Sequence, residues 1–271
     1  MRTRCQAVFL DAAGVIVLPD RDLVAGALAA VGVDVDPSSV ARAHYLAVRQ
    51  LDHEPQMREA SEPYFRALCS TLEVPDERRS FAIQALAHLG DRRLSGRILW
   101  SEPAPGASRA MAALERAGIA VVIVTNSDGH AAENLRDAGI CQTGAGPGVS
   151  VTEVVDSALV GAAKPDPAIF RFALRRAAAK PGSVVHVGDM LSADIEGAQA
   201  AGIPPLHLDP TRACRARGHR HLRSLNGIWR HVAPLIPPRG PDTVAGGAPS
   251  PRPAVLGASR ARPRLVAGHR S

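Results

Sequence analysis

The chain has 271 residues, of which 46% are hydrophobic and only 3% aromatic, so we expect a sizeable core built mainly from Ala, Val and Leu. The net charge of +6 is uneven, because residues 1–211 hold 20 basic and 25 acidic side chains whereas residues 212–271 hold 12 arginines and one acid. With no apolar run of about 18 residues and no C-x-x-C pair among the four cysteines, we expect no membrane partner and a cytoplasmic protein with reduced thiols.

The first predicted element is a short apolar strand, Ala7–Leu10, which stops at Asp11 and leads into a turn at Gly14. An apolar run of this length between turn residues is typical of a buried parallel strand. Ligands of open α/β sheets bind beyond the carboxyl ends of such strands. The carboxylate of Asp11 is therefore the first candidate functional group.

Residues 20–96 lose the strand pattern and place apolar residues at helical spacing. The predicted helices cover Leu23–Val31, Pro37–Leu51, Ser61–Leu72 and Asp76–Leu89. We interpret residues 19–97 as an all-helical insertion, with connections at about 15–20 and 95–103.

Strands and helices alternate again after residue 98. The predicted elements are helix Ser108–Ala117, strand Ile119–Val124, helix His130–Ala138, a strand near Val151–Val155, helix Ala168–Ala178, strand Val184–Val187, helix Ala193–Ala201 and strand Pro205–Leu208. Such alternation implies βαβ units. We predict an α/β fold, a doubly wound Rossmann-like parallel sheet formed by residues 1–18 and 98–232.

The C-terminal part is basic. Residues 211–230 could hold a last short strand and helix, whereas residues 233–271 contain Pro, Gly, Ala, Ser and Arg without periodicity, so we expect a disordered tail. No aromatic residue follows Trp229 to stack on bases, which favours a solvated tail over a nucleic-acid partner.

Three residues near the start of this basic region, Cys214, His219 and His221, could suggest a metal site. Their spacing fits no strong zinc template, and a fourth ligand is missing. We therefore expect no zinc site there.

Chemically matching groups follow the ends of the later strands, namely Thr125, Lys164, Asp189 and Asp194. A carboxylate such as Asp11 can attack phosphorus, while a hydroxyl and an ammonium can hold phosphate oxygens. Carboxylates are also ligands that Mg²⁺ prefers. Without a cation these acids would repel one another and any phosphate, so the cluster indicates a bound metal ion.

Each of these residues also has a purely structural interpretation. Asp11 could cap a turn, and Thr125 could belong to a helix N-cap. Asp189 and Asp194 could be helix-start carboxylates. Lys164 could lie in an exposed loop, although it is one of only two lysines in the chain. The functional interpretation depends on the set rather than on any single member.

Four stretches resemble the motifs of the haloacid dehalogenase-like (HAD) hydrolases, most closely the branch with a helical cap inserted after the first motif. They are Val8–Val15, Val121–Ser127, Lys164–Pro167 and Val187–Asp194. The resemblance extends from about residue 5 to 230. It implies an α/β core with an inserted all-helical cap, and a Mg²⁺-dependent hydrolase of small phosphorylated metabolites.

The resemblance implies a metal-binding role for four residues. Asp11 would be both the nucleophile, forming an aspartyl-phosphate, and a Mg²⁺ ligand. The backbone carbonyl of Ala13 and the carboxylate of Asp189 would complete the protein ligands. Asp194 would support the metal or orient Lys164.

The resemblance also implies how the phosphate would be held. Thr125 would hydrogen-bond a phosphoryl oxygen, and Lys164 would stabilise the charge on nucleophile and phosphate. Asn126 is a further candidate for a phosphoryl contact.

Position 13 departs from the family pattern. Active phosphatases of the family usually carry Asp there as general acid and base, and this chain carries Ala13. General acid–base catalysis is typically worth about 10²–10⁴-fold. The sequence therefore predicts a phosphatase of reduced activity, with a catalytically impaired binding or regulatory protein of the same family as the alternative.

Other groups could supply the missing proton transfer. The candidates are His44, Arg49 and His53 in the helical insertion, and Asp128 and His130 after the second motif. The sequence places none of them at the leaving group.

Two family branches also lack this Asp, and neither fits. Phosphonoacetaldehyde hydrolases use a cap lysine, but residues 1–163 contain no lysine. Haloacid dehalogenases do not use Mg²⁺, whereas this chain keeps the metal motif at Asp189 and Asp194.

Overall fold

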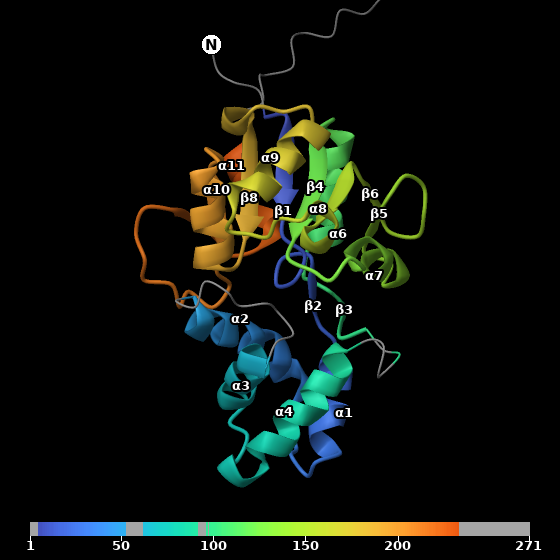
Figure 1. Cartoon of the computed structure of the whole chain (residues 1–271), viewed down its shortest axis with the longest axis vertical. Helices are drawn as coiled ribbons and strands as arrows, with labels where there is room; N and C mark the ends of the chain where they lie inside the picture. Colours follow the sequence, from blue (N-terminus) through green and yellow to red (C-terminus); the bar gives the residue numbers. More distant parts are fainter. Residues whose placement is uncertain (1–4, 53–61, 92–95, 97, 233–271) are drawn as a thin grey trace, which may run out of the picture. The chain divides into compact units, whose positions relative to one another are not determined.

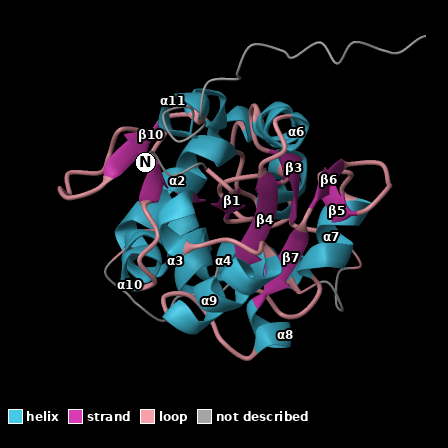
Figure 2. Ribbon diagram, turned by 90° about the horizontal axis from the view of Figure 1, so that it is seen from above, coloured by secondary structure: helices cyan, strands magenta, loops and turns pink. Residues whose placement is uncertain are grey.

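The computed structural model describes most of the chain, namely residues 5–52, 62–91, 96 and 98–232. Within these residues the main sheet has six parallel strands in the order β10-β9-β8-β1-β4-β7. They are β1 (Ala7–Leu10), β4 (Ala120–Thr125), β7 (Glu153–Asp156), β8 (Val184–Gly188), β9 (Pro205–Leu208) and β10 (Arg220–Leu222). Figure 2 labels β10, β1, β4 and β7 of this sheet. The predicted doubly wound α/β fold is confirmed.

Strand β1 lies in the middle of the sheet, with Leu10 in register with Ile123 of β4 and Val187 of β8. Successive residues of a strand face opposite sides of the sheet. Val8 and Leu10 accordingly belong to one buried cluster, and Ala7 and Phe9 to another. All of β1 is buried because both faces of the sheet are covered, as parallel sheets require.

The helices that alternate with these strands along the chain cover the two faces of the sheet. They are α6 (Ala107–Arg116), α7 (Ala131–Asp137), α8 (Ser157–Val160), α9 (Pro167–Arg176), α10 (Gly197–Ala200) and α11 (Trp229–Val232). Met111 and Leu114 of α6 pack on the Val8 side, and Ile169 and Phe170 of α9 pack on the Phe9 side.

The chain is helical where the sequence predicted a helix over Ala193–Ala201, but it is not a single α-helix. The chain instead forms a π-helical segment, Leu191–Glu196, followed by the short helix α10. Within it the carboxylate of Asp194 turns back to accept a hydrogen bond from the backbone N–H of Met190 at 3.1 Å. Wide helical turns of this kind occur frequently at functional sites.

The insertion after the first strand is helical over its described residues, as predicted, and forms its own group of helices (Figure 1). They are α1 (Arg21–Ala29), α2 (Val40–Leu51), α3 (Glu62–Thr71) and α4 (Asp76–Gly90), with a 3₁₀ turn at Pro37–Ser39 where the sequence predicted an α-helix. A separate apolar cluster that includes Leu28, Phe65 and Leu86 holds them together. The predicted domain boundaries remain predictions.

The connections to the insertion are strands, which the sequence did not predict. Strand β2 (Val17–Pro19) pairs antiparallel with β3 (Trp100–Pro103). A second small sheet pairs β5 (Cys141–Thr143) with β6 (Val149–Val151).

No helix of the described residues has both the length and the apolar content that crossing a membrane needs. The predicted tail, residues 233–271, lies outside the described residues.

Candidate active site

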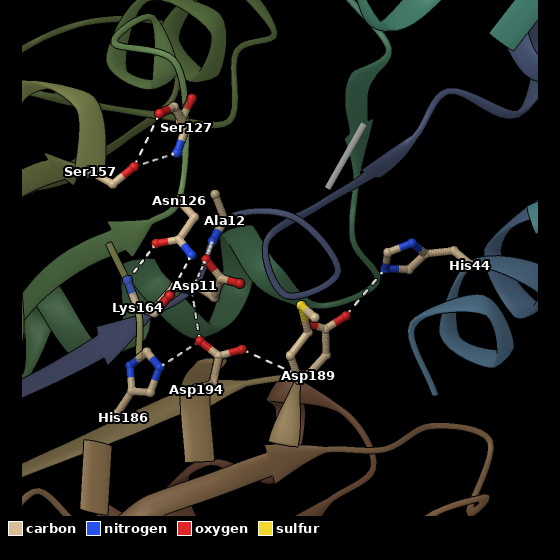
Figure 3. A network of polar contacts seen from close by, with 11 residues as sticks. Asp11, Ala12, His44, Asn126, Ser127, Ser157, Lys164, His186, Asp189 and Asp194 are labelled. Carbon is tan, nitrogen blue, oxygen red and sulfur yellow. Dashed lines mark hydrogen bonds and ion pairs between the residues drawn. The ribbon is translucent and has the colours of Figure 1, made fainter. Parts of the chain in front are cut away.

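The carboxyl ends of the three central strands carry the predicted catalytic groups. Asp11 follows β1, Thr125 ends β4 and Asp189 follows β8, and all three are buried. One carboxylate oxygen from each of Asp11, Asp189 and Asp194 lies within 4.8 Å of the others. The structure therefore brings the predicted acids together at one edge of the sheet (Figure 3).

Lys164 connects two of these acids. Its Nζ lies 2.7 Å from Oδ1 of Asp11 and 2.7 Å from Oδ1 of Asp194, and the side chain is almost completely buried. A buried ammonium is tolerated only when charged partners compensate its lost hydration. Both partners are here the acids that the sequence analysis selected.

Asn126 holds the backbone that carries Lys164. Its Oδ1 accepts the backbone N–H of Lys164 at 2.7 Å, and its Nδ2 donates to the Lys164 carbonyl at 2.9 Å (Figure 3). This two-way pairing fixes the loop from β4 to the lysine. It gives Asn126 a positioning function that the sequence did not suggest.

The two acids that share Lys164 differ in their electrostatics. Burial raises the pKa of Asp11 to about 6, although Lys164 acts in the opposite direction. Burial alone would also raise the pKa of Asp194, but Lys164 and His186 outweigh it and hold that pKa well below its usual range. Asp194 is thus the firmly ionised partner of the lysine, while a further cation would favour ionised Asp11.

Both oxygens of Asp194 are engaged by the protein itself. Oδ1 contacts Lys164 and Nε2 of His186, the latter at 3.0 Å, and Oδ2 accepts the Met190 N–H. Of the two functions predicted for Asp194, this arrangement favours orienting Lys164.

The family comparison agrees with this geometry. Residues 5–202 match the family model of the haloacid dehalogenase-like hydrolases. The chain belongs to this family. The resemblance found in the four motifs is confirmed.

Two curated relatives align over short segments of this HAD-like chain. It is 36% identical over 98 residues to the mouse haloacid dehalogenase-like hydrolase domain-containing protein 3, a match that covers 36% of each protein. It is 51% identical over 51 residues to glyceraldehyde 3-phosphate phosphatase of Methanopyrus kandleri, covering 19% of this chain and 22% of that protein. The aligned segments thus span about a third or less of each relative's length.

Solved structures share the fold over most of the chain. The HAD hydrolase YfnB of Bacillus subtilis, solved with magnesium, has a TM-score of 0.56 at 19% identity and covers 85% of this chain and 100% of its own. A dehalogenase has a TM-score of 0.53 at 18% identity and covers 85% and 97%. At such identities the likeness shows the fold alone.

His44 of α2 reaches this HAD-like site from the insertion. Its Nε2 lies 3.3 Å from Oδ2 of Asp189 and its Nδ1 lies 3.0 Å from the hydroxyl of Tyr64 (Figure 3 shows the first contact). Complete burial lowers the pKa of His44 to about 3, so the ring is neutral. The pairing is satisfied when Nε2–H donates to Asp189 and Nδ1 accepts from Tyr64.

The other predicted proton donors have different partners. Arg49 pairs with Asp52 at 2.6 Å. His130 lies 3.4 Å from Glu133 and is mostly exposed, and the carboxylate of Asp128 accepts the His130 N–H at 3.2 Å. His53 lies outside the described residues.

Sequence reasoning missed two further contacts between the insertion and this edge. The hydroxyl of Tyr45 donates to the Gly14 carbonyl at 2.9 Å, and Oδ1 of Asp52 accepts the Leu191 N–H at 2.7 Å. Neither residue belongs to a HAD motif. The available signal was their place in the sequence, since Tyr45 follows His44 in helix α2 and Asp52 is the C-cap of that helix.

The prediction that Cys214, His219 and His221 lack a fourth ligand is wrong. His207 of β9 completes the group, and one ligand atom from each residue lies within 4.8 Å of the others. This fourth ligand could not be predicted from the sequence because His207 lies in strand β9. Only the pairing of β9 with β10 brings His207 close to the other three residues.

Two glycines allow the acids to approach the backbone. A Cβ on Gly188 would lie 2.0 Å from Cγ of Asp194, and one on Gly14, where φ is +75°, would lie 2.0 Å from Oδ2 of Asp189. Because Lys164, His186 and Met190 fix the Asp194 carboxylate, it cannot move aside cheaply.

We therefore expect Gly188→Ala to lower the free energy of unfolding by about 1–3 kcal/mol, the usual cost of overpacking a rigid site. Gly182→Ala is the matched control, since nothing lies within 4 Å of its Cβ position, and it should change that free energy by less than about 0.5 kcal/mol. Urea unfolding of both variants measures the difference. Equal stability of the two would contradict the tight packing of Asp194.

Proposed function

We propose that this HAD-like hydrolase is a Mg²⁺-dependent phosphohydrolase that acts on a small phosphorylated metabolite through an aspartyl-phosphate at Asp11. The observation that carries the proposal is the buried ammonium of Lys164, 2.7 Å from both Asp11 and Asp194, beside the carboxylate of Asp189. This set combines a nucleophile, a fixed positive charge and the donors of a hard cation.

The donor set suits Mg²⁺ because its members offer oxygen atoms. Asp11, Asp189 and the backbone carbonyl of Ala13 would hold the ion, with Asp194 beside them. When bound, Mg²⁺ would neutralise phosphate charge near the nucleophile.

Each residue of the site then has its own role in the reaction. A carboxylate oxygen of Asp11 attacks phosphorus, forming a new O–P bond while the bond to the leaving oxygen breaks. Lys164 stabilises the negative charge of the transferring group, and the hydroxyl of Thr125 donates to a phosphoryl oxygen. Water then attacks the phosphorus of the acyl phosphate, which releases inorganic phosphate and restores Asp11.

Proton transfer to the leaving oxygen is the step for which the proposed site provides the least suitable side chain. Ala13 supplies no acid, and the neutral ring of His44 is held between Tyr64 and Asp189. Substrates whose leaving oxygen is already a good leaving group should therefore react fastest, because they depend least on general acid catalysis.

Removal and return of the metal test the proposal. Tag-free protein freed of Mg²⁺ by dialysis against metal-free buffer, without a chelator, should release phosphate at least about tenfold more slowly, since the acids would then face the phosphate uncompensated. Adding Mg²⁺ alone should restore the rate. The assay uses a panel of small phosphate esters and includes glyceraldehyde 3-phosphate, the substrate named for the archaeal relative. Phosphate release that is insensitive to Mg²⁺ would contradict the proposal.

A second function is favoured by Ala13 itself. A catalytically impaired HAD-like protein would bind a phosphorylated ligand or a partner protein at the same edge without turning it over. Calorimetry with Mg²⁺ and a phosphate ester separates the two, because this alternative requires binding without phosphate release.

A further inference from the structure

Four side chains of types that can bind a metal ion gather at the β9–β10 end of the main sheet, apart from the cluster of acids. They are His207, Cys214, His219 and His221. His207 and His221 are register partners on the parallel strands β9 and β10, the latter at the end of the sheet opposite β7 (Figure 2). Cys214 and His219 come from the connection between those strands. The fold thus converges three segments on one point.

The three distances from His219 to the other ligand atoms are close to those of a tetrahedral metal site. Nε2 of His219 lies 3.2 Å from Nδ1 of His207, 2.8 Å from Nε2 of His221 and 3.7 Å from Sγ of Cys214. Around a tetrahedral Zn²⁺, two nitrogens are about 3.3 Å apart and a nitrogen and a sulfur about 3.6 Å apart, given the usual metal–ligand bond lengths.

Without a metal ion, hydrogen bonds satisfy the nitrogen and sulfur atoms of this cluster poorly. Nε2 of His207 lies 3.0 Å from the backbone carbonyl of Asp189, an acceptor, so Nε2 carries the hydrogen and Nδ1 presents a lone pair to His219. Nε2 of His219 faces His207, His221 and Cys214 but can donate only one hydrogen. The remaining lone pairs would face one another, and a cation at their centre removes that conflict.

We propose that His207, Cys214, His219 and His221 bind a Zn²⁺ ion in a Cys-His₃ site, separate from the site of the acids. One thiolate and three imidazoles suit zinc and are poor ligands for Mg²⁺, which prefers oxygen. Four protein ligands and no open position are typical of a structural rather than a catalytic zinc ion.

The surrounding groups hold the ligands in place, as the outer shell of a metal site does. The Asp189 carbonyl fixes the ring of His207. Asp209, at the end of β9, accepts the backbone N–H of Cys214 at 3.1 Å and that of Ala213 at 3.1 Å, which fixes the loop carrying the cysteine. Its own N–H donates to the Leu222 carbonyl of β10 at 2.8 Å.

The zinc ion would join the connection after β9 to the edge of the sheet. It would also hold His207 in the tautomer that donates to the Asp189 carbonyl. Zinc binding thus supports the backbone of an acid in the neighbouring cluster without taking part in the reaction.

Metal analysis of tag-free protein tests the proposal directly. Wild-type protein should retain about one equivalent of zinc after dialysis. Cys214→Ser and His219→Ala should lose most of it, whereas His88→Ala, an exposed histidine of α4, should keep it. Co²⁺ in place of zinc should give the visible bands of a tetrahedral complex and a thiolate charge-transfer band that Cys214→Ser removes.

Asp189→Asn separates this proposal from the proposed function. It should keep the zinc equivalent, since its backbone carbonyl is unchanged, and lose Mg²⁺-dependent phosphate release. Wild-type protein that retains no zinc even after dialysis against Zn²⁺ would overturn the site. So would unchanged zinc content in both Cys214→Ser and His219→Ala, with circular dichroism to confirm that the variants are folded.

Discussion

Asp11→Asn is expected to reduce Mg²⁺-dependent phosphate release by at least about a thousandfold, the scale on which removal of a nucleophile acts. The amide has nearly the shape of the carboxyl group but cannot attack phosphorus to form an acyl phosphate. The substitution also removes one anionic partner of the buried Lys164. The other partner, Asp194, remains 2.7 Å from the ammonium. The measurement is kcat/KM on the best ester of the panel.

The control for this variant is Asp34→Asn, which changes an exposed acid of the insertion and should keep wild-type kcat/KM. Thermal unfolding of both variants establishes that they are folded. If Asp11→Asn retains activity within about tenfold of the wild type, Asp11 is not the nucleophile, because general electrostatic effects of one buried acid have that smaller size.

The meeting of the site's polar groups at one edge could be predicted because it follows from parallel strands. Asp11, Thr125 and Asp189 each stand where an apolar run stops, and parallel strands place all such positions at one edge. Lys164 could be predicted as a member of the site because it follows a predicted strand, and the rarity of lysine in this chain supports it. Once the loop that carries Lys164 lies over the same edge of the sheet, its ammonium can contact both Asp11 and Asp194 at 2.7 Å.

The features that could not be predicted depend on strand pairing and side-chain contacts that form only when the chain folds. Strands β2 and β3 are three and four residues long and pair across the whole helical insertion. The contact of His44 with Asp189 depends on how α2 packs on the sheet edge. His207 joins Cys214, His219 and His221 only through the register of β9 with β10.

Position 13 offers the test with the clearest gain of function. The side chain of Ala13 is buried, one residue from Gly14, whose Cβ position is bounded by Asp189 and His44. A carboxyl group introduced by Ala13→Asp would be buried, and burial raises the pKa of a carboxyl group. A protonated carboxyl group near neutral pH is what a general acid requires.

We expect Ala13→Asp to raise kcat by about 10²-fold or more for esters with poor leaving groups, the usual contribution of general acid–base catalysis. Ala13→Asn, which has the same shape without the transferable proton, should leave kcat near the wild-type value. The gain should shrink for activated esters, because their leaving oxygen needs no proton. A wild-type rate that already shows no dependence on the leaving group, together with no gain in Ala13→Asp, would mean that another group supplies the proton. Absence of turnover in both proteins despite ligand binding would favour the impaired binding protein.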